Sequence, residues 1–171
     1  MVRRKIDKKR NPVYALQLSL QNAKEFLEKL CEFTDKLQEL ESDPNKLLQK
    51  NPDIWRETRI LRKALWIALI IEIGRLFDTY ENETKKVISF KKIFKDSSLE
   101  NAVNSIHGEA IIAKILATRH TFTAHISENQ GSILSAPEIC NSNLRTLLDK
   151  LEPPLTSYTL WFMQNNKWEN R

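Results

Sequence analysis

An uninterrupted apolar run, Ala64 to Ile71, lies inside the longest helical pattern of the chain, roughly Pro52 to Thr79. Eight consecutive apolar residues cover every side of a helix. Such a helix has no polar face to give to water, so other elements must enclose it. The run is also far shorter than the roughly 20 residues that span a bilayer. It therefore predicts a central helix of a soluble domain.

Three further helices are expected around this one, since start signals recur along the chain. Asn11-Pro12 and Asn51-Pro52 place proline at the first helical position, where its missing N–H costs nothing. Ser97 to Glu100 and Ser135 to Glu138 are S-x-x-E capping boxes, in which serine and glutamate satisfy each other's amides. These signals predict four main helices.

The first helix, roughly Pro12 to Glu41, is predicted to be amphipathic and to lie on the outside. A short helix from Asp43 to Gln49 continues it. One buried stripe is expected from the spacing of its apolar residues, which are Leu16, Leu20, Phe26, Leu27, Leu30, Phe33, Leu37 and Leu40.

The third helix is predicted to run without a break from Leu99 into the segment Arg119 to His125, before the stop signal Asn129-Gln130-Gly131. Its expected stripe alternates steps of four and three, as in bundle packing: Leu99, Val103, Ile106, Ala110, Ala113 and Ala117.

The fourth helix starts near Ala136, and Pro153-Pro154 interrupts it before an apolar stretch from Leu155 to Met163. Two interpretations stay open, a kinked helix or a separate fifth helix. No segment shows the alternation of a strand. The sequence thus predicts an all-α, antiparallel four- to five-helix bundle in which residues 11–171 form a single domain.

Residues 1–10 form a basic arm with a net charge of +5, which equals the charge of the whole chain. Such an arm can follow the phosphates of RNA. It can equally be a solvated terminus without a binding role. Its six cationic residues, predicted to bind RNA, are Arg3, Arg4, Lys5, Lys8, Lys9 and Arg10.

Several classes of function are disfavoured. No apolar stretch follows the basic start to make a signal peptide, so a cytoplasmic protein is expected, with no membrane partner. Cys31 and Cys140 have no metal-ligand spacing. No Glu-x-x-His occurs, and His120 and His125 are five residues apart instead of three or four. Neither a metal nor another cofactor is expected.

The densest group of catalytic residue types is Arg119-His120-Thr121-Phe122-Thr123-Ala124-His125. On a helix, Arg119 and His125 are about 120° apart around the axis and about 9 Å apart along it. An arginine can hold a phosphate there while a histidine transfers a proton. The spacing alone equally fits a surface arginine and a histidine at a helix C-terminus.

The other two histidines have less distinctive settings. His120 continues the stripe of Ala113 and Ala117, so a packed or interface position is expected as readily as a catalytic one. His107 lies beside Gly108 earlier on the predicted helix, and a structural role is expected for it.

Three charged residues, Glu72, Arg75 and Asp78, follow the apolar run at intervals of three. Charges that enter a core need partners or a polar cavity. They can pair with one another along the helix. They can also face the end of the third helix and form a polar pocket with it. The sequence leaves both arrangements open.

Together these motifs resemble the HEPN superfamily, in its abortive-infection-associated (AbiU-like) branch. The family signature of arginine, a polar residue and a later histidine is matched by Arg119, His120 and Ala124-His125. The segment Ile71 to Asp78 is similar to the charged apolar helix that precedes the motif in that branch. The resemblance covers roughly residues 55–126.

The resemblance implies a homodimeric, metal-independent endoribonuclease, a toxin or phage-defence effector with an antitoxin or other regulatory partner. In such enzymes the 2′-hydroxyl attacks the adjacent phosphate and leaves a cyclic phosphate. His125 would then be the acid/base group, Arg119 would clamp the phosphate and His120 would assist, with Glu72, Arg75 and Asp78 in support. The alternative is a non-catalytic HEPN-like module that binds RNA or protein.

Overall fold

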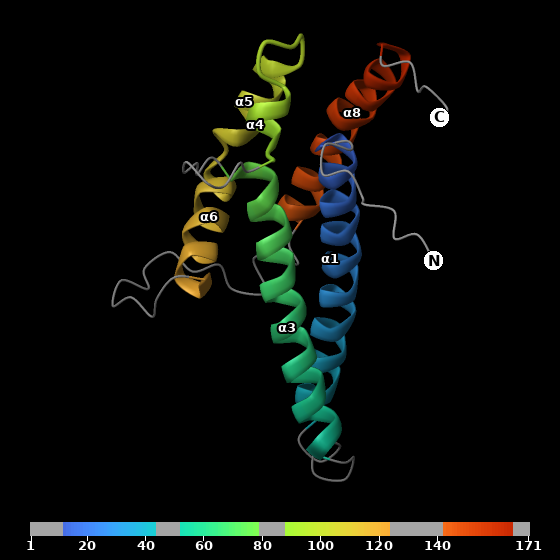
Figure 1. Cartoon of the computed structure of the whole chain (residues 1–171). Coiled ribbons are helices and arrows are strands. Elements are labelled where there is room, and N and C mark those ends of the chain that lie inside the picture. The colour runs from blue at the N-terminus through green and yellow to red at the C-terminus, as the bar shows by residue number, and fades with distance from the viewer. Residues whose placement is uncertain (1–11, 44–51, 79–87, 124–141, 166–171) are drawn as a thin grey trace, which may run out of the picture.

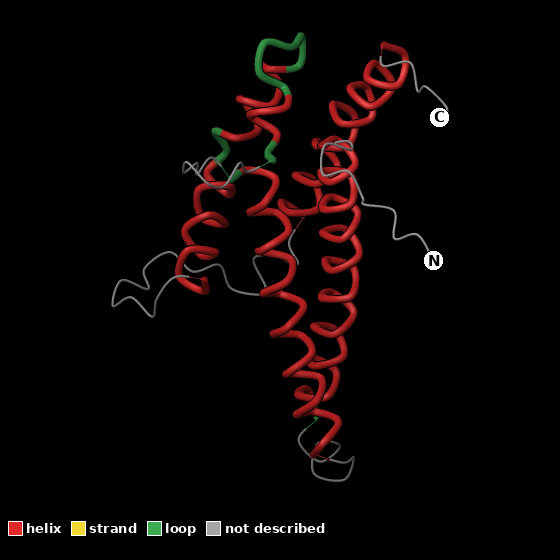
Figure 2. Tube along the Cα trace, viewed as in Figure 1, coloured by secondary structure: helices red, strands yellow, loops and turns green. Residues whose placement is uncertain are grey.

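The structure of the protein is a computed structural model, and the residues described are 12–43, 52–78, 88–123 and 142–165 (Figures 1 and 2). In these four segments all regular secondary structure is helical, which confirms the predicted all-α class. The helices are α1 (Pro12–Ser42), α3 (Pro52–Phe77), α4 (Phe90–Ile93), α5 (Glu100–His107), α6 (Ala110–Thr123) and α8 (Ser142–Asn165).

The four long helices form a bundle in which each runs opposite to the one before it, while α4 and α5 lie together at one end (Figure 1). Helix α3 packs against both α1 and α6, and α8 packs against α1. The starts predicted at Pro12 and Pro52 are confirmed. Of the short helix predicted from Asp43, only Asp43 is described, and it is not helical.

The apolar run of α3 is enclosed only in part. Trp66, Leu69 and Ile70 are buried, whereas Ala64 is exposed. Apart from Thr58, every buried residue of α3 lies at or beyond Trp66. The reason is length, because α6 is much shorter than α3 and covers only its C-terminal half (Figure 1). The prediction of a central helix therefore holds for that half.

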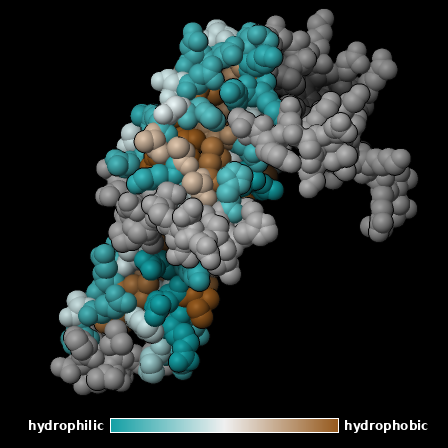
Figure 3. Space-filling model, turned by 90° about the vertical axis from the view of Figure 1, so that its left-hand side faces the viewer, coloured by the Kyte–Doolittle hydropathy of each residue, from teal (hydrophilic) through white to brown (hydrophobic). Residues whose placement is uncertain are grey.

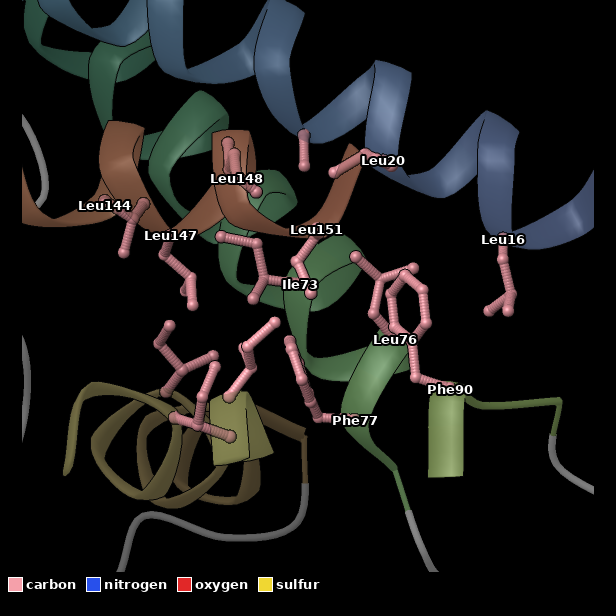
Figure 4. Packing of buried hydrophobic residues seen from close by; sticks show 14 of the residues in the cluster. Leu16, Leu20, Ile73, Leu76, Phe77, Phe90, Leu144, Leu147, Leu148 and Leu151 are labelled. Carbon is pink, nitrogen blue, oxygen red and sulfur yellow. The ribbon is translucent and has the colours of Figure 1, made fainter. Parts of the chain in front are cut away.

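A single core joins α1, α3 and α8. The α1 stripe is confirmed at Leu16, Leu20, Leu27, Leu30 and Leu37, whereas Phe26, Phe33 and Leu40 are half-buried at its edges. Figure 4 shows leucines of α8 packed towards the end of α3 and towards Leu20 of α1, and they are Leu144, Leu147, Leu148 and Leu151.

Outside the core, the Nζ atom of Lys24 on α1 forms ion pairs with two carboxylates of α8, Glu152 at 2.7 Å and Asp149 at 3.4 Å. The hydrogen bond to Glu152 raises the pKa of Lys24 above its usual value. Because both carboxylates are well exposed, this pair adds little to the free energy of unfolding.

The unbroken third helix predicted from Leu99 is wrong. Helix α5 ends at His107, and α6 begins at Ala110 after a short non-helical step (Figure 2). Gly108 caps α5 with its N–H bonded to the carbonyl of Asn104. Glycine is unfavourable in the interior of a helix, so ending the helix at Gly108 costs less free energy than it would at most other residues.

The break also changes which residues of α6 face the core. Val103 and Ile106 are buried as predicted, but Ala110 and Ala113 are exposed and Ala117 is only half-buried. Ile112, Ile115 and Thr118 are buried in their place. The stripe was extrapolated across Gly108, whereas α6 starts a new helical phase after it.

Two further local predictions are decided by the structure. The capping box predicted from Ser97 to Glu100 is wrong: Leu99 is the N-cap of α5 and has no side-chain cap, while Ser97 Oγ accepts the N–H of Leu99 and Glu100 accepts that of Asp96. Helix α8 continues through Pro153 and Pro154, which excludes a separate fifth helix there. The predicted fourth-helix start near Ala136 lies outside the described residues.

Within the described segments, no helix is both long enough and apolar enough to cross a membrane. Figure 3 shows apolar surface scattered among hydrophilic atoms on the side that carries α6 in Figure 1. Ile60 and Leu61 of α3 are among the exposed large apolar residues.

Replacement of the fully buried Ile73 by alanine is expected to lower the free energy of unfolding by about 2–5 kcal/mol, because it leaves a cavity in the core. Ile60→Ala on the same helix is the matched control, since Ile60 is 61% exposed, and a change within about 0.5 kcal/mol is expected. Denaturant unfolding measures both. Equal losses for the two variants would contradict this core.

Candidate functional site

Arg119 lies near the end of α6 and reaches back across to α3. Its Nη1 donates hydrogen bonds to Oδ2 of Asp78 at 2.8 Å and to the carbonyl oxygen of Gly74 at 3.2 Å. The side chains of Arg119 and Asp78 are only 21% and 15% exposed. A charge-assisted bond at this depth is shorter and stronger than one in open water. The guanidinium is therefore held in a fixed position at the junction of the two helices.

Gly74 makes this approach possible. A Cβ atom built on Gly74 would fall against Cδ of Arg119, and its three nearest heavy atoms all belong to that side chain. Because Gly74 has no side chain, the aliphatic part of the Arg119 side chain can lie directly against the backbone of α3. Gly74 and Asp78 are four residues apart, so they lie on the same side of the helix.

Sequence reasoning did not single out Gly74 as part of the site. The usable signal was a glycine inside a strongly helical, apolar segment, with an acidic residue one turn later. A glycine in that setting usually marks a close approach by another element.

The three charges predicted to support the site separate into two groups. Nη1 of Arg75 pairs with Oε1 of Glu72 at 3.0 Å within α3. Asp78 instead turns to Arg119 on α6. Each of the two arrangements that the sequence left open therefore occurs, for different members of the set.

The described residues do not bring all predicted catalytic groups together. His120 is exposed, so the expectation that it continues a packed stripe is wrong, because α6 starts a new helical phase after Gly108. His125 lies outside the described residues, two positions beyond the end of α6 at Thr123. The basic arm, residues 1–10, lies outside them as well.

His107 is half-buried at the end of α5. Its ring lies 5.9 Å from the ring of Phe77, next to Asp78 in the chain. Its Nε2 is buried and accepts or donates no hydrogen bond. The ring contact indicates that His107 packs the end of α5 against the end of α3.

In the described segments, no three His, Cys, Asp or Glu side chains are grouped closely enough to hold a metal ion. Comparisons with models of protein families, with characterised proteins and with solved structures give no match.

Gly74→Ala is expected to lower the free energy of unfolding by about 1–3 kcal/mol, because the added methyl group displaces Arg119. In an Arg119→Ala background the same substitution is expected to raise it by up to about 1 kcal/mol, since alanine favours a helix over glycine. Urea unfolding of the four proteins measures both effects. An effect of the same sign in both backgrounds would show that Arg119 does not depend on Gly74.

Proposed function

We propose that the protein is a metal-independent endoribonuclease of the HEPN type, acting as a toxin or phage-defence effector. The observation that carries this proposal is the anchored guanidinium of Arg119, held by Asp78 and the Gly74 carbonyl near the end of α6. His120 and His125 follow it within six residues. The resemblance of these motifs to the HEPN signature supports the same conclusion.

In the proposed reaction the 2′-hydroxyl oxygen of RNA attacks the neighbouring phosphorus. A base takes the hydroxyl proton, and the bond from phosphorus to the 5′ oxygen breaks as that oxygen accepts a proton. The products are a 2′,3′-cyclic phosphate and a 5′-hydroxyl end. An imidazole titrates near neutral pH and is suited to these transfers, the role proposed for His125.

Arg119 would stabilise the negative charge that builds on the phosphate oxygens. A guanidinium fixed before the substrate arrives needs little reorganisation during the reaction. Asp78 supports this role by position, since it orients Arg119 from the neighbouring helix. The exposed His120 would contact the RNA or a second copy of the chain in the proposed homodimer. A regulatory partner protein would restrain the nuclease activity.

One observation favours a second candidate, a non-catalytic module that binds RNA or protein. The bond from Arg119 to Asp78 is also what a purely structural arginine would make between two helices. In that case the bonds of Arg119 to Asp78 and to the Gly74 carbonyl hold α6 against α3. The basic arm, residues 1–10, would then supply the contact with RNA.

Purified protein is expected to cleave labelled RNA in excess EDTA, and His125→Ala is expected to slow cleavage by about 10²–10⁴-fold through loss of acid/base catalysis. Arg119→Ala should also abolish cleavage, and Arg145→Ala, at an exposed position on α8, is the matched arginine control. Thermal unfolding of each variant separates loss of chemistry from loss of fold.

The nuclease mechanism is wrong if the wild type leaves RNA intact, or if the His125 and Arg119 variants cleave as fast as the wild type. RNA retention without cleavage would instead support the binding module.

Removal of residues 1–10 is expected to weaken RNA binding and to make it less sensitive to salt. The arm carries six cationic side chains. For single strands each phosphate contact adds about 0.7 to the slope of log K against log salt concentration, so the slope should fall by up to about 4. Titrations at several salt concentrations measure it, and an unchanged slope would exclude the arm from the interface.

A further inference from the structure

Helix α3 carries a strip of cationic side chains on the half that α6 leaves uncovered. Arg56, Arg59 and Lys63 form this α3 strip, and all three are exposed. On a straight helix they lie within about 60° of one another around the axis. They follow one another at intervals of three and four residues, so successive charges are one turn apart. The α3 strip therefore presents three positive charges on one side of the helix.

The α3 strip lies on the same side of α3 as the contact with Arg119. Gly74, whose carbonyl accepts a hydrogen bond from Arg119, follows Arg56 by 18 residues. Eighteen residues are five full turns, so Arg56 and Gly74 point to one side of the helix, about 27 Å apart along its axis. Helix α6 occupies this side only over the C-terminal half of α3 (Figure 1). The α3 strip thus continues from the end of α6 towards the start of α3.

The guanidinium of Arg59 is oriented before any ligand arrives. Its Cζ lies over the ring of Trp55, 4.6 Å from the ring centre, in a cation–π contact. The indole Nε1 of Trp55 in turn donates a hydrogen bond to Oε1 of Glu41 on α1 at 3.0 Å. Arg59 remains exposed in this arrangement, so it can still meet a ligand. A group that is oriented in advance loses less conformational entropy on binding.

The charges of the α3 strip are only weakly compensated. Arg56 lies 3.7 Å from Asp53, with side chains 73% and 68% exposed. An ion pair this open contributes little free energy, so an anion can replace Asp53 at small cost. Residues 52–63 contain four cationic side chains against two acidic ones. Ile60, which is 61% exposed, lies among these cations. This surface suits a polyanion that also offers apolar area.

Single-stranded RNA has both properties. Two members of the α3 strip are arginines, which hold phosphate oxygens in a bidentate manner and also stack on bases. The bases of a single strand are free to leave the stack and can cover Ile60. An acidic peptide would match the charges but offers no planar group for Arg59 or apolar area for Ile60.

We propose that the α3 strip binds the phosphates of single-stranded RNA and guides the strand to the anchored Arg119. The proposal rests on the proposed function for its ligand class, RNA, and adds a binding surface on α3 to it. The strand would then run along the uncovered side of α3 and reach the end of α6.

The test is titration of the full-length protein with a labelled single-stranded RNA that carries 2′-O-methyl groups, followed by fluorescence anisotropy. Methylation blocks the attacking hydroxyl, so binding is measured without cleavage. The triple variant Arg56→Ala, Arg59→Ala, Lys63→Ala is expected to bind this RNA more weakly than wild type. Each phosphate contact adds about 0.7 to the slope of log K against log salt concentration, so the slope should fall by up to about 2.

A second triple variant with the same net charge is the matched control. It combines Lys29→Ala and Lys36→Ala on α1 with Arg145→Ala on α8, all at exposed positions outside α3. It should keep the affinity and the salt dependence of wild type. Equal weakening in the two triple variants would reveal an effect of net charge alone and overturn the proposal, as would wild-type binding by the strip variant.

The double variant Arg56→Ala, Lys63→Ala keeps the contact of Arg59 with Trp55, in case the triple variant is less stable. Its slope should fall by up to about 1.4. Its melting temperature should stay near that of wild type, because alanine is favourable in a helix. An unchanged slope in this folded variant would also overturn the proposal.

Cleavage of unmethylated RNA in EDTA, measured on the same preparations, keeps the two proposals apart. Cleavage by wild type, together with RNA binding that does not depend on the α3 strip, overturns the strip alone. Binding of methylated RNA that depends on the strip, without any cleavage, supports the strip and overturns the nuclease. Binding of polyglutamate through the strip, with no binding of RNA, would assign it to an acidic protein and overturn both proposals.

Discussion

The enclosure of the C-terminal half of α3 is the constraint on which the other features depend. From Trp66 to Phe77 this helix packs against α1 and α6, and its buried residues share one core with the leucines of α8. Burial of that apolar surface is the main favourable contribution to folding in a bundle of this size. It also fixes the direction in which the last turns of α3 point their polar side chains. The two groups that hold Arg119, the Gly74 carbonyl and the Asp78 carboxylate, lie within this segment and directly after it.

The same two turns of α3 serve three purposes. Leu76 and Phe77 continue the core, Gly74 and Asp78 receive Arg119, and Glu72 with Arg75 borders a groove towards α1. These roles do not conflict because a helix turns by about 100° per residue and so presents neighbouring residues to different partners. A substitution in one role will therefore be felt in the others through small shifts of a shared backbone.

The sequence predicted much of the fold, because the signals were local. Proline at Pro12 and Pro52 and the leucine periodicity of α1 need no knowledge of tertiary structure. The prediction of one unbroken third helix was wrong at Gly108, where α5 ends. The regular spacing of apolar residues on both sides of this glycine gave no sign of the break. As a direct result, the residues predicted to form the buried side of α6, and the packed position predicted for His120, were wrong.

The candidate site was harder to predict, because its contacts lie between helices. The spacing of Glu72, Arg75 and Asp78 allowed pairing within α3 or across to α6, and only the packing of the helices separates the two. The role of Gly74 depends in the same way on where the stem of Arg119 passes.

The short length of α6 has a consequence for how stability is distributed. Beyond the reach of α6 and α8, α1 and α3 continue as a two-helix arm (Figure 1), in which Thr58 is the single buried residue on the α3 side before Trp66. Amide hydrogens in such an arm are expected to exchange through local fraying, and those around the fully buried Ile73 through opening of the whole domain. The pair of Arg119 and Asp78 thus lies at the end of α3 where burial is concentrated, and the opposite end is expected to open at a lower free energy.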